Sequence, residues 1–184
     1  MLVRRMRRKD GNVSIYNANF AGYSGKDMSI NNTAEYIKEA RAKFDSYGSE
    51  WEKAYFNDSS GGYVVVHKGH KFDVETGKYE IKTAHISSDN GYMVEMMDES
   101  NFEKPQYDIN VNGFPTEIKA MRGFRNIHKR AEDAAYQDAK RIVYYIRFDN
   151  DKEMFKRFIN VFRTVYKIEE IWYIKNDRLH YFKK

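Results

Sequence analysis

The chain has 184 residues, a net charge of +5 and 16% aromatic residues, which predicts one soluble, basic domain. It contains no cysteine, which excludes disulfides, thiolate metal sites and a cysteine nucleophile, and suits a reducing cytoplasm. We expect no membrane span and no secretory signal, because the sequence lacks the apolar runs that these need. A basic, tyrosine-rich composition suits a polyanionic partner such as nucleic acid, although a solvated surface over an aromatic core is the alternative.

The first 50 residues are predicted to form a basic arm and one helix. Residues 1–9 are basic without periodic apolar partners, which is typical of a mobile arm. The arginines of this arm are Arg4, Arg5, Arg7 and Arg8. Residues 10–31 show no clear period. A helix is expected between Asn32, its predicted N-cap, and Gly48, because apolar residues recur there at helical spacing.

Residues 51–184 are predicted to form a nuclease-like α/β domain with a central mixed sheet and helices on both sides or along one face. Helical periodicity predicts helices over residues 78–90 and 126–141, and a third helix that residues 149–151 cap. Apolar runs and alternation predict strands at residues 62–67, 92–97, 106–111, 114–121, 142–148, 168–174 and 178–183. This order of elements favours a layered α/β fold over an all-helical or sandwich fold.

The sharpest local prediction is a β-hairpin at Asn112-Gly113, a dipeptide that favours a two-residue turn. Such a turn fixes the register, so Asp108 is expected directly opposite Glu117. Alternation then places Asp108, Glu117 and Lys119 on one polar face of the hairpin, opposite an apolar face. Opposed carboxylates with Cβ atoms about 4.5–5.5 Å apart destabilise a sheet, so we expect a compensating cation.

Two carboxylates and a lysine are the groups that a metal-assisted phosphodiester hydrolase requires. Asp108 and Glu117 are candidate ligands of Mg²⁺ or Mn²⁺, an ion that would polarise the phosphate and lower the pKa of a water molecule. Lys119 would orient that water or neutralise the phosphate. The alternative is a solvent-facing hairpin in which Lys119 simply pairs with Glu117 or with a neighbour across the sheet.

The stretch PQYDINVNGFPTEIK (105–119) resembles the PD-(D/E)xK nuclease signature, in which an acid on one strand is followed by a turn and E-x-K. Residues 60–148 also resemble nuclease domains at the C-termini of bacterial contact-dependent inhibition toxins and of some phage minor-head proteins. The matching residues are Glu80, Ala84, Asn90, Gly91, Tyr92, Val94, Asp108, Gly113, Glu117, Ile118, Lys119, Ile127, Ala135, Gln137 and Ile142.

This resemblance implies a nuclease acting on RNA, tRNA included, or on DNA in a cytoplasm, with an immunity protein as a candidate partner. It also implies that a helix glutamate completes the metal site, which makes Glu80 the candidate third carboxylate. A solvated first-turn glutamate is the alternative for Glu80. Two other functions stay open: a metal-independent toxin RNase that uses His128 and Lys119, and a non-catalytic phage or mobile-element protein that binds nucleic acid.

Basic residues around His128 form a predicted phosphate-binding rim, for which a solvated helix face is the alternative. The rim residues are Arg122, Arg125, Lys129 and Arg130, and the arginines of the arm would add to them. His67 and His70 have H-x-x-H spacing, but a zinc site there is the less favoured interpretation because no third ligand is obvious.

Overall fold

The computed structural model describes residues 33–100 and 106–183, and the backbone of three short strands near the N-terminus. Those strands are β1 (Met6–Arg7), β2 (Val13–Ser14) and β3 (Ser24–Asp27). The other strands are β4 (Trp51–Phe56), β5 (Tyr63–His67), β6 (Met93–Met96), β7 (Ile109–Val111), β8 (Phe114–Met121), β9 (Arg141–Ile146), β10 (Glu170–Lys175) and β11 (Arg178–Lys183). The helices are α1 (Ala34–Ser46), α2 (Gly77–Asp89), α3 (Ile127–Tyr136) and α4 (Asp151–Thr164), with a 3₁₀ turn η1 (Phe124–Asn126) before α3.

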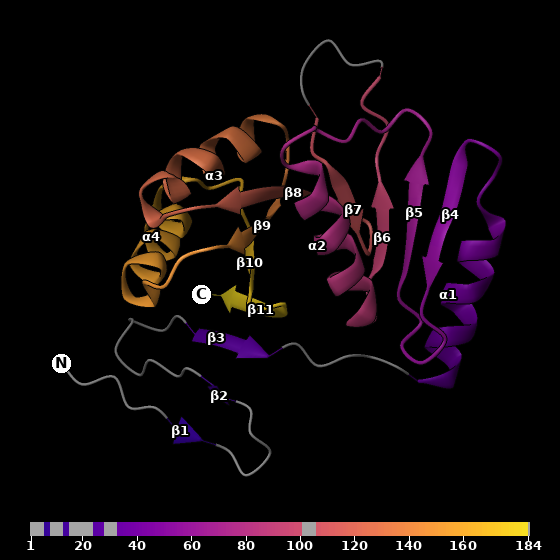
Figure 1. Cartoon of the computed structure of the whole chain (residues 1–184), viewed down its shortest axis with the longest axis horizontal. Helices are drawn as coiled ribbons and strands as arrows, with labels where there is room; N and C mark the ends of the chain where they lie inside the picture. Colours follow the sequence, from indigo (N-terminus) through magenta and orange to yellow (C-terminus); the bar gives the residue numbers. More distant parts are fainter. Residues whose placement is uncertain (1–5, 8–12, 15–23, 28–32, 101–105, 184) are drawn as a thin grey trace.

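One mixed sheet organises the molecule, with the strand order β3-β11-β10-β9-β8-β7-β6-β5-β4 among the described residues (Figure 1). The pairs β5–β6, β8–β9 and β9–β10 are parallel and the remaining pairs are antiparallel. β1 and β2 pair with each other outside this sheet. The predicted α/β fold with a central mixed sheet and flanking helices is therefore confirmed.

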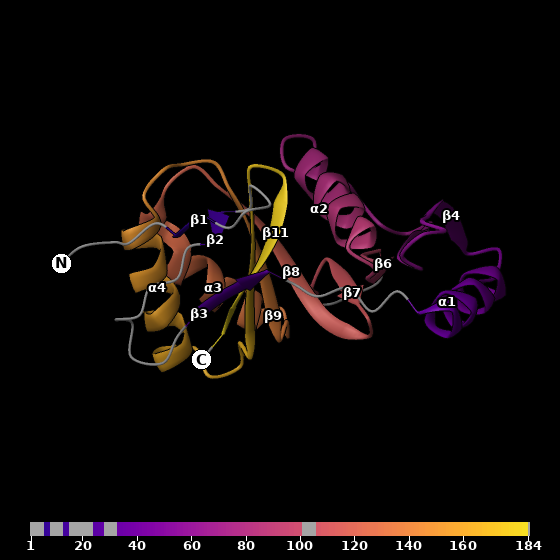
Figure 2. The same cartoon turned by 90° about the horizontal axis from the view of Figure 1, so that it is seen from below.

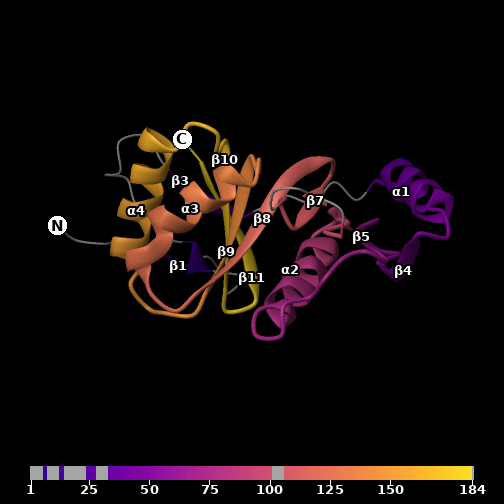
Figure 3. The same ribbon diagram turned by 90° about the horizontal axis from the view of Figure 1, so that it is seen from above.

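Helices cover both faces of the sheet. α2 packs on the face that presents Val94, Val111 and Val143. α3 and α4 cover the opposite face of the β9 end, where they bury Ile142 and Tyr144. α1 also lies opposite α2, as Figures 2 and 3 show, and it packs at the β4 end of the sheet. The hairpin β7–β8 lies in the middle of the sheet, between the strands that α1 covers and those that α3 and α4 cover.

The N-terminal helix shares a small core with the sheet. Ala40 and Phe44 of α1 pack with Tyr63 and Val65 of β5. The predicted basic arm falls on residues whose side chains lie outside the described part of the chain, and the division at residue 50 stays a prediction. Within the described residues, no helix combines the length and apolarity that a membrane crossing requires.

The predicted hairpin turn at Asn112-Gly113 is confirmed, and a second turn of the same kind joins β10 to β11. Asn112 and Gly113 adopt positive φ angles of 51° and 76°, and Asn176 and Asp177 adopt 53° and 58°. These are the left-handed conformations that a type I′ turn requires at both central positions. The β7–β8 ladder pairs Val111 with Phe114 and Ile109 with Thr116, which is the predicted register.

Some predicted elements differ in extent from the observed ones, and some strands were missed. The helix expected over residues 126–141 ends at Tyr136, because the chain turns through Asp138 at φ 61° and Arg141 already belongs to β9. The strand expected from residue 106 begins only at Ile109. β3 and β4 were not predicted, and β4 carries mainly exposed and half-buried side chains without clean alternation.

Candidate active site

The candidate site lies at the open end of the β7–β8 hairpin, beyond the last paired residues, Ile109 and Thr116. β8 continues to Met121, whereas its partner β7 starts at Ile109, so none of the described strands lies beside the β8 edge beyond Glu117 on that side. Side chains take over the hydrogen bonds there. The Asp108 backbone N–H donates to Glu117 Oε2 at 3.0 Å, and the Ile118 N–H donates to Asp108 Oδ2 at 2.8 Å. The two acids are therefore cross-strand neighbours, as the register predicted.

Lys119 completes the cluster by pairing with Glu117. Its Nζ donates to Glu117 Oε1, and the Glu117 side chain is 0% exposed while that of Lys119 is 22% exposed. This ion pair is the contact that the solvent-facing alternative assigned to Lys119. The polar face is nevertheless not solvent-facing, because Glu117 is fully buried.

Burial and like charge set the protonation of this cluster. Burial raises the pKa of Asp108 well above its usual value, and the neighbouring Glu117 carboxylate raises it further. Burial also raises the pKa of Glu117, against the opposing effect of Lys119. Burial alone would lower the pKa of Lys119, but Glu117 and Asp108 outweigh it and raise that pKa. Lys119 therefore stays cationic, and the negative charge of the two acids is only partly balanced.

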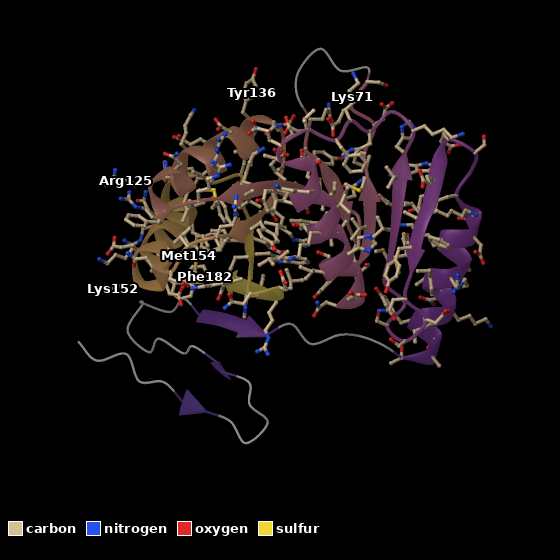
Figure 4. The ribbon with its side chains drawn as sticks, viewed as in Figure 1. Lys71, Arg125, Tyr136, Lys152, Met154 and Phe182 are labelled. Carbon is tan, nitrogen blue, oxygen red and sulfur yellow. The ribbon has the colours of Figure 1, made fainter. Side chains whose placement is uncertain are left out.

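These groups line a cavity of about 280 Å³ between the start of α2, the open edge of β8 and α3. Figure 4 shows Lys71, before α2, and Tyr136, at the end of α3, at this same end of the molecule. Among the described residues, five carboxylates and three cations line the cavity. They are Asp73, Glu80, Glu99, Asp108 and Glu117, and Lys71, Lys119 and Arg130.

Glu80 lies where the resemblance implied, on the first turn of α2 and lining the cavity. It is nearly buried, and its charge raises the pKa values of both Asp108 and Glu117. It is therefore close to the acidic pair, and it is not the solvated first-turn residue of the alternative interpretation.

His70, which the sequence suggested only as half of an H-x-x-H zinc motif, lies close to the Glu80 carboxylate. His70 is fully buried, with Nε2 3.7 Å from Glu80 Oε2 and Nδ1 3.0 Å from Glu99 Oε1. Burial opposes its charge, but the nearby Glu80 and Glu99 carboxylates and the Met97 carbonyl oxygen, 2.9 Å from Nδ1, raise the pKa of His70 to about 10. His67 instead faces Asp98, at 3.8 Å, so the two histidines do not converge. Within the described residues, no three His, Cys, Asp or Glu side chains are arranged to hold a metal ion by themselves.

Sequence reasoning missed several residues of the cavity. Lys71, Asp73 and Glu99 lie outside helices and strands, and no local pattern connects them with the hairpin. His70 carried a signal only as half of an H-x-x-H motif. Its role beside Glu80 depends on the pairing of distant segments, which the spacing does not reveal.

The predicted phosphate rim is divided by the fold. Arg130 lines the cavity, and Lys129 lines an adjoining groove. Arg122 and Arg125 precede α3, and Figure 4 shows Arg125 far from Tyr136, at the opposite end of that helix. The side chains of Arg4, Arg5, Arg7 and Arg8 lie outside the described residues.

His128 points toward a neighbouring helix. Its Nε2 lies 2.7 Å from Thr164 Oγ1 of α4, and its Nδ1 lies 3.8 Å from Glu132 Oε2. The cavity beside Lys119 is lined by other described residues, with Arg130 and Gln137 from this part of the chain. The fold therefore separates His128 from the cluster around Lys119.

Comparisons with known proteins support the fold. The structure is similar to a chain of the CdiA-CT/CdiI toxin and immunity complex from Burkholderia pseudomallei, with a TM-score of 0.50 and 14% sequence identity. The match covers 65% of this chain and 98% of the other. No protein-family model and no curated protein sequence matches the chain. The shared feature is thus a fold found in a toxin and immunity complex.

Proposed function

We propose that this protein is a nuclease that hydrolyses phosphodiester bonds in RNA, tRNA included, or in DNA, with the help of Mg²⁺ or Mn²⁺. The observation that carries the proposal is the cavity in which Asp108 and Glu117 are buried side by side next to Lys119. Its described lining holds more carboxylates than cations. A phosphodiester is itself an anion, so it would be repelled unless a further cation entered the cavity.

The donor set fits such an ion. Mg²⁺ prefers carboxylate oxygens, keeps several waters and commonly binds through one or two carboxylates together with substrate phosphate. A site of two acids therefore does not require three converging protein ligands. Asp108 and Glu117 would hold the ion, with Glu80 beside them, and the bound ion supplies Lewis-acid chemistry to the phosphate and to a water.

The chain's own cations have separate roles in this proposal. Lys119, kept cationic by the two acids, stabilises the negative charge that develops on the phosphate or orients the attacking water. Arg130 lines the cavity from α3 and attracts the phosphate group. His70, with Nε2 3.7 Å from Glu80 Oε2 and Nδ1 3.0 Å from Glu99 Oε1, places a positive charge beside the Glu80 carboxylate.

The metal-independent alternative receives less support. It required His128 to act together with Lys119, whereas His128 contacts Thr164 of α4. A non-catalytic nucleic-acid-binding protein is the remaining alternative. It would not need the destabilising pair of buried carboxylates, since phosphate binding is served by cations alone.

The fold similarity extends the proposal to a biological role. We infer that the nuclease acts as a toxin in the cytoplasm of a target cell and is neutralised by an immunity protein. The similar chain comes from a toxin and immunity complex, which supports this role. Induced expression in a bacterium should arrest growth, and the variant Lys119→Met should relieve the arrest. Equal arrest by both proteins would contradict the inference.

The purified full-length protein tests the proposal on total tRNA, a single-stranded RNA and plasmid DNA, with Mg²⁺, with Mn²⁺ or with EDTA. We expect cleavage of at least one substrate with the ion and none with EDTA. Asp108→Asn should be inactive, whereas Glu170→Gln, which changes a carboxylate outside the cavity, should cleave normally. Cleavage that survives EDTA would support the metal-independent alternative. No cleavage under any condition would support the non-catalytic one.

A further inference from the structure

A second depression adjoins the candidate active site on α3. It is a groove of about 600 Å³ lined by the last two turns of this helix, and Gln137 lines both the groove and the acidic cavity. The described residues of the groove are Lys129, Glu132, Asp133, Tyr136 and Gln137. The two depressions therefore adjoin at Gln137, at the end of α3.

The groove differs from the cavity in its charge. Asp133 pairs with Lys129 at 3.0 Å and lies 3.6 Å from Arg130, and Glu132 lies 3.8 Å from His128. Asp133 is thus matched by two cations of the same helix, and Lys129, Arg130, Glu132 and Asp133 together carry no net charge. A surface that is close to neutral does not select a phosphate, so the groove suits an uncharged part of a nucleotide.

Tyr136 gives the groove an aromatic surface. Its side chain is 67% exposed, although it belongs to a helix that packs against the core. Figure 4 shows it projecting from the end of α3, at the end of the molecule where Lys71 lies. Large aromatic side chains exposed beside a phosphate-binding site serve as platforms on which bases stack.

We propose that this groove binds an unpaired nucleobase next to the scissile phosphate, by stacking it on Tyr136. The inference rests on the proposed nuclease function and names its substrate class: single-stranded or looped nucleic acid. A base within a duplex is already stacked and paired, so it cannot stack on Tyr136 without being flipped out of the duplex. Stacking depends on the π-face that every base has, so the subsite tolerates sequence variation.

The test uses the full-length Asp108→Asn protein, which should not cleave the substrate and should repel it less than the wild type does without metal, because one carboxylate of the cavity is replaced by a neutral amide. Its affinity for a labelled single-stranded RNA, and for the same RNA annealed to its complement, is measured by fluorescence anisotropy over a range of KCl concentrations. Adding Tyr136→Ala should weaken single-strand binding about 5- to 150-fold. The slope of log affinity against log salt should not change, because tyrosine releases no counterion. Duplex binding should also be unaffected.

Two variants serve as controls. Tyr136→Phe keeps the ring and should bind like the parent, and Tyr166→Ala removes a tyrosine that is 86% exposed beyond α4 and should have no effect. Single-strand binding unchanged by Tyr136→Ala, or an equal loss for duplex and single strand, would overturn the inference while leaving the nuclease proposal intact. A parent protein that binds no nucleic acid would overturn both.

Discussion

Two buried charged clusters on neighbouring strands show what distinguishes a structural ion pair from a candidate active site. In the first, Arg141 of β9 is 6% exposed and donates to Glu170 Oε2 at 2.7 Å and to the Val111 carbonyl at 3.2 Å. Its guanidinium carbon lies 3.9 Å from the ring centre of Trp172 and 4.6 Å from that of Phe114. One cation meets one carboxylate, and the remaining contacts are hydrogen bonds and aromatic faces.

The second cluster, Asp108, Glu117 and Lys119, surrounds the fully buried Glu117 but is not balanced. Two carboxylates share one lysine, and they border a cavity instead of packed rings. A buried ion pair whose partners satisfy each other indicates a structural role, whereas excess charge beside a cavity indicates that a ligand completes it. The predictions below test this contrast, beginning with the largest expected effect.

The largest effect is expected on cleavage. Lys119→Met removes the cation that faces the phosphate, and single-turnover cleavage should fall by about 10²–10³-fold, the usual cost of losing one stabilising group. Arg141→Met removes the buried cation of the other cluster, and its cleavage rate per folded molecule should match the wild type. Rates are measured at a temperature where circular dichroism shows both variants folded. An equal loss in both variants would remove the functional distinction between the clusters.

The next effect concerns stability. Arg141→Met leaves Glu170 without its cation and should lower the free energy of unfolding by about 2–3 kcal/mol, less than for a fully buried pair because Glu170 reaches water. Urea denaturation followed by circular dichroism measures this loss. A stability within error of the wild type would show that the Arg141 cluster does not hold the strands together.

Asp108→Asn should instead raise the free energy of unfolding. The pKa of Asp108 in the folded protein is raised above its unfolded-state pKa of about 3.9. Its carboxyl group therefore stabilises the folded state fully below about pH 3.9, and this contribution is lost as the pH rises through the folded-state pKa. The neutral amide avoids this loss, so the variant should gain about 1 kcal/mol at neutral pH without metal. Near pH 3, a pH of about one unit below the unfolded value, it should gain little. Urea titrations at both pH values measure the difference, and a gain that is equal at both would contradict the pKa argument.

The smallest expected effect is a difference in the salt dependence of nucleic-acid binding between arginines at the two ends of α3. Arg130 lines the cavity and Arg125 lies beyond the other end of the helix, so Arg130→Ala should reduce the salt dependence of nucleic-acid binding more than Arg125→Ala. A phosphate contact changes the slope of log affinity against log salt by about one. Anisotropy titrations over a salt series give both slopes. A larger change for Arg125→Ala would place the phosphate path at the η1 end.

The two clusters also show which features of the site the sequence could predict. The dipeptide Asn112-Gly113 requires positive φ angles, so the turn, the register and the meeting of Asp108 with Glu117 followed from local chemistry. The burial of Glu117 did not follow, because it depends on α2, α3 and the sheet closing around the hairpin. His70 and Glu99 reach the site through long-range packing for the same reason. β4 was missed because its side chains do not alternate between buried and exposed.

The most direct test of the central claim is thermal melting of the wild type and Asp108→Asn, each with and without saturating Mn²⁺. An ion that binds the folded cavity and not the unfolded chain raises the melting temperature. We expect Mn²⁺ to raise the melting temperature of the wild type and to leave that of Asp108→Asn nearly unchanged. Asp108→Asn should also melt higher than the wild type when no metal is present. If Mn²⁺ shifts neither protein, or shifts both equally, the acidic pair does not bind a cation and the metal mechanism is wrong.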